Sequence, residues 1–222
     1  MRSLTITLVT RELYLNRWLI ATAIFAGLLS VYLASTSQLG YSIGVLLWLT
    51  IIVTVGVILP MYGIHQERKD RSLLFALSLP LSGADYARAK MLGLLLCFFL
   101  PWFILSLAAV VWVLAMPGVP DGMLPFVVLL CGFLIANFSL VLCGALLMTS
   151  EVLIITVVIV TNMCVSLFLF LVFAIPGINN HLQSAVPVWN EVVWTVLIVE
   201  VAVLSFALLL PLFVIPRRRT FI

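Results

Sequence analysis

HQERKDRSLLFALSLPLSGADYARAK, residues 65–90, is the only long polar stretch in an otherwise apolar chain. It contains five of the eleven Lys and Arg residues and three of the eight Asp and Glu residues, and long apolar runs flank it on both sides. We expect any contact with a water-soluble partner to be made here, because the remainder of the chain offers little polar surface.

The composition is that of an integral membrane protein. Of the 222 residues, 65% are hydrophobic and 9% are charged, and the mean hydropathy is +1.33, whereas a soluble domain keeps roughly a quarter of its residues charged. A hydrocarbon core about 30 Å thick is crossed by about 20 apolar residues. The sequence therefore predicts an all-α fold, a single transmembrane domain over 1–222, with spans at 18–34, 43–63, 91–116, 126–148, 152–175 and 192–215.

The basic residues indicate how these spans are oriented. They fall only within 2–17, 68–90 and 217–219, and an even number of spans places these three regions on one side of the membrane. The positive-inside rule assigns that side to the cytoplasm. We therefore expect a multi-pass protein of the plasma (bacterial inner) membrane with both termini cytoplasmic. Basic clusters beside spans follow from topology alone, so nucleic-acid binding is not expected.

Residues 1–17 are mixed in polarity and precede the first span. Ile6, Val9 and Leu13 could line one face of a helix, with Arg11 and Glu12 elsewhere, which suits a helix at the cytoplasmic interface. A signal peptide is the competing interpretation, although the positively charged segment is long for one.

Small residues in the apolar runs point to packing. Gly40 and Gly44 form a small-xxx-small pair, which allows two helices to approach closely. The four cysteines show neither metal-ligand spacing nor a disulfide framework, and we expect them to be packing residues: Cys97, Cys131, Cys143 and Cys164.

Within the polar stretch, the pattern predicts two short helices separated by a proline. Residues 67–78 would form an amphipathic helix with Leu74 and Leu77 on its apolar stripe. Pro80 ends that helix, and Ser82 opens an approximate capping box for a second helix that leads into the span at 91–116. Such a unit is a rigid strut that can transmit a push. A solvated loop whose leucines lie on lipid headgroups would fit the same residues.

This stretch resembles the loop between the second and third spans of ABC-2 type transporter permeases. In that family an acidic residue precedes a Gly-Ser/Thr-Leu step, and a Leu-Pro pair, a Ser, a Tyr and a Lys follow. The matching positions here are Glu67, Ser72-Leu73-Leu74, Leu77-Ser78-Leu79-Pro80, Ser82, Tyr86 and Lys90. Arg71 departs from the family, which often has Gly there. The six-span layout extends the resemblance loosely over the whole chain.

The resemblance implies that residues 64–90, the coupling segment, dock on a separate cytoplasmic ABC ATPase subunit. The residues that would carry this role are Glu67, Arg68, Asp70, Arg71, Leu74, Leu77 and Pro80. It also implies a second permease chain, identical or different, and export by alternating access. The small outer loops and the apolar spans favour an amphipathic or hydrophobic substrate, such as a peptide, lipid or drug. Because the chain has no GxxxxGK[ST] phosphate loop, ATP and Mg²⁺ would be bound by the partner, and no cofactor is expected here.

Three polar residues are expected near the middle of the bilayer: Asn137, Asn162 and Glu200. An ionisable side chain at that depth costs ~2.5–3.5 kcal/mol on the insertion scale, so it usually faces protein or a water-filled cavity. The three could line a substrate path. Interhelical hydrogen bonds of the two amides, and a protonated Glu200 that shares its proton with a neighbour, are the alternatives.

Two other functional classes stay open. The haem-exporter B subunit is similar in length and span number, so a non-catalytic membrane assembly subunit could share the same loop. A membrane-embedded enzyme would need a catalytic constellation, and the HExxH motif and a pair of intramembrane aspartates are absent from the sequence. We therefore expect a transport subunit rather than an enzyme. No metal site is expected either, since His65 and His181 have no companion ligands.

Overall fold

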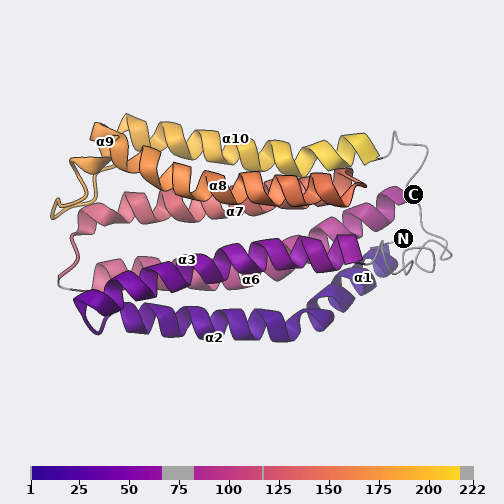
Figure 1. Cartoon of the computed structure of the whole chain (residues 1–222), viewed down its shortest axis with the longest axis horizontal. Helices are drawn as coiled ribbons and strands as arrows, with labels where there is room; N and C mark the ends of the chain where they lie inside the picture. Colours follow the sequence, from indigo (N-terminus) through magenta and orange to yellow (C-terminus); the bar gives the residue numbers. More distant parts are fainter. Residues whose placement is uncertain (1, 67–82, 117, 216–222) are drawn as a thin grey trace.

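The computed structural model describes residues 2–66, 83–116 and 118–215, and the regular elements in these ranges are all helical (Figure 1). In chain order they are α1 (Arg2–Leu15), α2 (Arg17–Ala34), α3 (Gln38–Pro60), the π-helical η1 (Met61–Gln66), α6 (Gly83–Ala115), the 3₁₀-helical η2 (Asp121–Met123), α7 (Leu124–Leu147), α8 (Glu151–Ala174), α9 (Pro176–Asn179) and α10 (Glu191–Val214).

Six of these helical segments are long and apolar enough to cross a membrane. They are Arg17–Ala34, Gln38–Ile64, Tyr86–Ala115, Asp121–Leu147, Glu151–Ala174 and Glu191–Val214. The predicted all-α architecture and the six predicted spans are confirmed in the described part of the chain. The fold is thus that of a multi-pass membrane protein.

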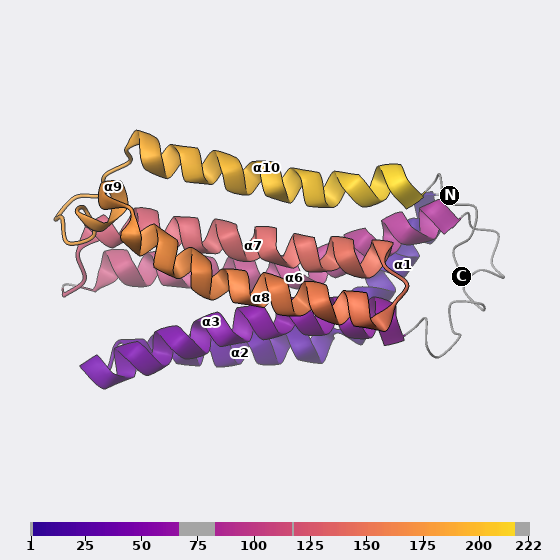
Figure 2. The same cartoon turned by 45° about the horizontal axis from the view of Figure 1, so that its top comes forward.

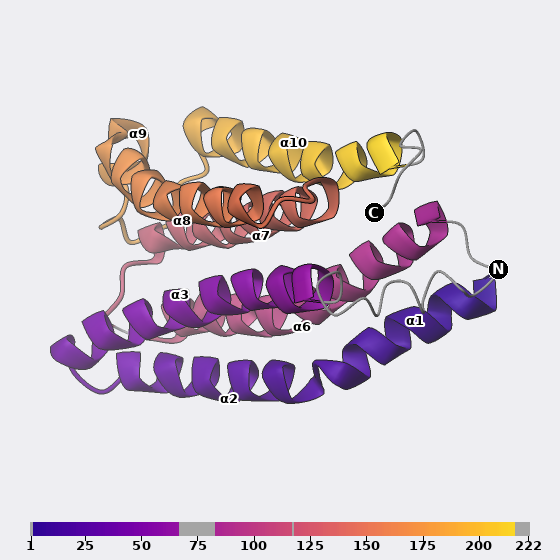
Figure 3. The same ribbon diagram turned by 45° about the vertical axis from the view of Figure 1, so that its right-hand side comes forward.

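The long helices form two groups that meet at α7. Helices α2, α3 and α6 form one group and α7, α8 and α10 the other (Figures 1 and 3). In the most apolar part of α7, 67% of the residues are buried, compared with 17% in α8 and 17% in α10. Helix α7 is therefore the central helix. Phe98 of α6 and Phe138 of α7 stack at the junction, with ring centroids 4.0 Å apart, and each is 1% exposed.

The helix ends segregate to the two ends of the bundle. The start of α1, the end of η1, the start of α6 and the end of α10 all lie at one end, on the right in Figure 1. The connections from α2 to α3, from α6 to α7 and from α8 to α10 lie at the other end. The described elements that adjoin the three basic regions of the sequence therefore lie at the same end of the bundle.

The glycine pair in α3 serves contact with α2. Gly40 and Gly44 are both buried, and a Cβ at Gly44 would lie 2.5 Å from Ser30 O and 2.7 Å from Ala34 N. These are backbone atoms of α2, so only glycine permits the observed approach of the two helices. The close packing expected from this pair is thus found within the chain.

Candidate functional site

The predicted docking residues lie outside the described part of the chain. Glu67, Arg68, Asp70, Arg71, Leu74, Leu77 and Pro80 all fall within 67–82. The flanking elements are described: η1 ends at Gln66 and α6 begins at Gly83. The structure therefore describes how the coupling segment is joined to the bundle.

A buried ion pair fastens α1 to the beginning of α6. Lys90 Nζ donates a hydrogen bond to Glu12 Oε1 at 2.6 Å, and the side chains are only 4% and 9% exposed, respectively. Gly93 provides the space, because a Cβ there would lie 2.9 Å from Glu12 Cγ. We name the Glu12–Lys90 pair the clamp. Removing either side chain would leave the charge of the other buried without compensation, which is strongly unfavourable.

The clamp corrects the face that the sequence assigns to the first helix. The sequence groups Ile6, Val9 and Leu13 on one face and puts Glu12 elsewhere; in the structure Ile6 is 64% exposed and Glu12 is buried. A hydropathy pattern cannot place a carboxylate inward unless its partner is known, and Lys90 is 78 positions away. The one signal in the sequence is that Glu12 is the only acidic residue before position 67.

Glu200 lies in the middle of α10, and its carboxylate is directed toward α7. The residue is 7% exposed, and a side chain at Gly132 of α7 would collide with Glu200 Oε2. Among the described residues, no group donates a hydrogen bond to Oε1 or Oε2. Glu200 stands nine positions after the first residue of α10, Glu191, or about 14 Å along the axis. An ionisable group at such depth marks a functional position by default.

Glu200 also lines a groove between α8 and α10 whose floor is α7, with both carboxylate oxygens covered against α7. Both outer helices pack on α7 but make little contact with each other, and Figure 2 shows α8 crossing α7 at an angle that takes it away from α10. The volume of this open space is about 380 Å³. We name this space the groove; the lining residues that matter below are Phe133, Asn137, Thr161, Phe168, Thr195 and Glu200.

The structure brings two of the three predicted mid-membrane residues together. Asn137 and Glu200 line the groove from α7 and α10. Asn162 does not line it: its Nδ2 donates to Val158 O at 2.7 Å within α8, and its Oδ1 has no hydrogen-bond partner among the described residues. The lining position on α8 belongs to Thr161.

Sequence reasoning missed Thr161 and Thr195 as lining residues. Each hydroxyl donates to a carbonyl oxygen of its own helix, Thr161 to Val157 O and Thr195 to Glu191 O, at 2.8 and 2.7 Å respectively. A threonine that satisfies its hydroxyl in this way is unremarkable in an apolar helix. Nothing in the sequence distinguishes these two threonines from those that face lipid.

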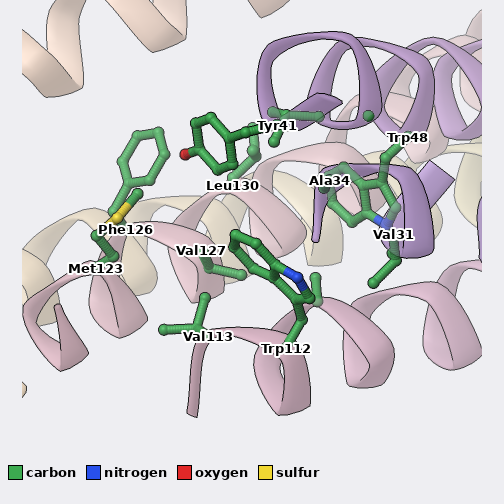
Figure 4. Close-up of a pocket in the computed structure, with 13 residues that line it drawn as sticks. Val31, Ala34, Tyr41, Trp48, Trp112, Val113, Met123, Phe126, Val127 and Leu130 are labelled. Carbon is green, nitrogen blue, oxygen red and sulfur yellow. The ribbon is translucent and has the colours of Figure 1, made fainter. Parts of the chain in front are cut away.

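A second, smaller cavity is lined by residues of α2, α3, α6 and α7 together with Met123 (Figure 4). Its volume is about 80 Å³, and the rings of Tyr41 and Trp112 in its wall stack with centroids 5.7 Å apart. Trp48 Nε1 donates to Leu105 O at 3.2 Å. The described residues that line this cavity include no charged side chain.

The described residues contain no group of three or more His, Cys, Asp and Glu side chains that could hold a metal ion. Comparisons of the chain with protein-family models, with curated proteins and with solved structures found no match. The function is therefore inferred from the pattern of the coupling segment and from the geometry of the clamp and the groove.

Proposed function

We propose that this chain is the permease subunit of an ATP-driven ABC transporter. The coupling segment would dock on a separate cytoplasmic ATPase subunit, which binds ATP and Mg²⁺, and the transporter would contain a second permease chain. The six apolar helices provide the transmembrane part. The exported molecule would be amphipathic or hydrophobic, because the groove is lined mainly by apolar side chains.

The observation that carries this proposal is the way α6 is built and held. It runs as one helix from Gly83, inside the coupling segment, to Ala115 at the far end of the bundle. The clamp ties the early part of this helix to α1. A displacement imposed on the coupling segment by an ATPase would therefore move α6 and α1 together, as alternating access by rigid-body motion requires.

The motion would pass from α6 to the central helix. Phe98 and Phe138 form a closely packed junction between the two helix groups, and the groove lies on the other helix group's side of α7. Rocking one group against the other would change the access of the groove to the two sides of the membrane.

In this proposal the clamp end of the bundle faces the cytoplasm of a bacterial inner membrane. Arg11 belongs to α1, Arg17 begins α2, and Arg88 and Lys90 belong to the first turns of α6, and α1 and the start of α6 lie at that end (Figure 1), as the positive-inside rule requires. Helix α1 would lie at the cytoplasmic interface, with Trp18 beside it at the start of the first span. The outer faces of α8 and α10, exposed at Phe170 and Ile198 for example, would meet lipid or the second permease chain.

Copurification tests the proposal. The tagged chain is purified from its native membrane in mild detergent, and the associated proteins are assayed for ATP hydrolysis and for a Walker-type ATPase subunit. We expect such a subunit to copurify, and we expect the triple variant Glu67→Lys, Asp70→Lys and Leu74→Asp to lose it. Glu191→Lys is the matched control, because it reverses an exposed carboxylate at the other end of the bundle.

Two outcomes would contradict the proposal. In the first, no ATPase accompanies the wild-type chain. In the second, the ATPase remains bound to the triple variant as firmly as to the control. An ATPase that binds through the coupling segment while the reconstituted complex moves no solute would instead support an assembly subunit.

A further inference from the structure

We propose that the groove binds a lipophilic cation, a molecule with one positive charge on an apolar body, and that Glu200 is its counter-ion. The inference rests on the proposed function in one respect: it makes such a cation the substrate class of the transporter. The binding site itself is argued from the groove alone.

The first step is that the Glu200 carboxylate has no hydrogen-bond partner among the described residues. Glu200 is 93% buried, the complement of its 7% exposure, and neither oxygen accepts a hydrogen bond among the described residues. A buried polar group without a partner is costly, and a buried charge is more costly still. The groove beside it is open space of about 380 Å³. In this proposal the carboxylate, whose oxygens are covered against Gly132 of α7, turns into the groove when a positively charged ligand enters it, and the ligand supplies the missing partner.

The second step is that this chain cannot supply that charge. In the sequence its basic residues are confined to 2–17, 68–90 and 217–219, and α7, α8 and α10, which form the groove, contain none. A second copy that spans the membrane in the same orientation has its basic residues at the same end. Neither a neighbouring helix nor a second copy therefore places Lys or Arg at the depth of Glu200.

The third step excludes a simple metal ion as the occupant. A hard cation such as Ca²⁺ takes six or more oxygen ligands, whereas the polar side chains that line the groove are one carboxylate, one amide, two hydroxyls and the Cys164 thiol, which hold fewer oxygen atoms than that between them. No second carboxylate stands beside Glu200 among the described residues that line the groove. The site suits an organic cation whose charge needs one counter-ion.

The last step is the apolar remainder of the wall. Phe133 and Phe168 stack at 4.1 Å and present aromatic surface to the groove from α7 and α8, and aromatic faces attract cations. Val199 and Val203 continue the apolar wall along α10. A volume of about 380 Å³ falls within the ~300–1,000 Å³ range of small-molecule sites. Carboxylate, aromatic pair and apolar wall together match a charged head on an apolar body.

Binding of tetraphenylphosphonium to the purified full-length chain in nanodiscs tests this inference, with empty nanodiscs subtracted. We expect saturable binding of this cation and none of the neutral triphenylphosphine oxide. Glu200→Gln should weaken binding at least about thirtyfold, because it removes one partner of a buried charge pair. Glu200→Asp, which keeps the charge, should retain part of the affinity, and Glu191→Gln at the exposed start of α10 should retain all of it.

Three results would overturn the inference. The first is equal affinity of the wild type and Glu200→Gln for tetraphenylphosphonium, and the second is equal binding of the neutral triphenylphosphine oxide. The third is an affinity for the cation that falls as the chain dimerises, because the groove would then be occupied by a second copy. If Glu200→Gln does not fold, Val203→Trp provides the second test, since it fills the groove and keeps the carboxylate. A folded Val203→Trp variant should lose the cation, and unchanged binding would refute the site.

The assay contains no ATPase, so its outcome is independent of the copurification experiment. Binding that depends on Glu200 in a chain without an associated ATPase would uphold the site and refute the transporter. An associated ATPase together with binding that ignores Glu200 would uphold the transporter and refute the site.

Discussion

Lys90 Nζ lies 2.6 Å from Glu12 Oε1, across 78 positions of sequence. Both side chains are almost fully buried, in a protein whose charged residues are only 9% of the total. The contact joins the first helix to the helix that leaves the coupling segment, so it is placed where a force from that segment would enter the bundle.

Breaking the clamp from one side should destabilise the protein more than removing it altogether. Lys90→Met leaves Glu12 buried without its partner and should lower the free energy of unfolding by about 3–5 kcal/mol. The double variant Glu12→Met and Lys90→Met replaces the pair by apolar side chains of similar size and should recover much of this loss. Thermal unfolding of the detergent-solubilised protein, followed by tryptophan fluorescence, measures both.

Arg11→Met is the control for the clamp, because it removes an exposed charge from the residue next to Glu12. It should shift the midpoint little. If the double variant is less stable than either single variant, the two charges do not act as a pair and the clamp is refuted.

The six spans could be predicted from hydropathy, because the hydropathy of a segment depends on its own residues and not on what it packs against. The start of α6 at Gly83 agrees with the predicted helix that leads into the third span, but the apolar segment begins at Tyr86 and not at 91. It includes Lys90, which is buried against Glu12, so a charge that the sequence places at the edge of a span lies inside a packed helix.

Helix rotation could not be predicted, because runs that are apolar on every face have no preferred side. The depth of Asn137, Asn162 and Glu200 followed from counting residues, but the structure turns Asn162 away from the groove and puts Thr161 in its place. Likewise, the Gly44 pattern predicted a close approach without naming α2 as the partner.

Gly44→Ala should destabilise the protein although alanine favours helices by about 1 kcal/mol relative to glycine. A Cβ at position 44 would lie 2.5 Å from the backbone oxygen of Ser30. Because a backbone atom can move away only if α2 moves as a whole, we expect the free energy of unfolding to fall by about 1–3 kcal/mol. Ser42→Ala introduces the same residue at an exposed position of the same helix and should be nearly neutral. Equal midpoints for the two variants would show that α2 and α3 are farther apart than described.

Phe138→Ala should be among the most damaging single substitutions in the helix bundle. The ring is 1% exposed and stacks on Phe98 between the two helix groups, so its loss leaves a cavity that costs about 3–5 kcal/mol. Phe103→Ala removes the same ring from a position that is 51% exposed on α6 and should cost far less. Comparable losses of thermal stability in the two variants would contradict the central position of the α6–α7 junction.

Cysteine labelling of intact cells tests which end of the bundle faces the cytoplasm. Thr149 is exposed in the turn between α7 and α8, at the clamp end, and Asn180 is exposed after α9, at the opposite end. A membrane-impermeant maleimide should label Asn180→Cys in intact cells and should label Thr149→Cys only after the cells are permeabilised, because the basic residues draw the clamp end inward. The unsubstituted chain is the control, since three of its four cysteines are buried and the fourth is half-buried in α8. The reverse labelling pattern would place the coupling segment outside the cell, away from any cytoplasmic ATPase, and the proposed function would then fail even if the clamp and the groove stand.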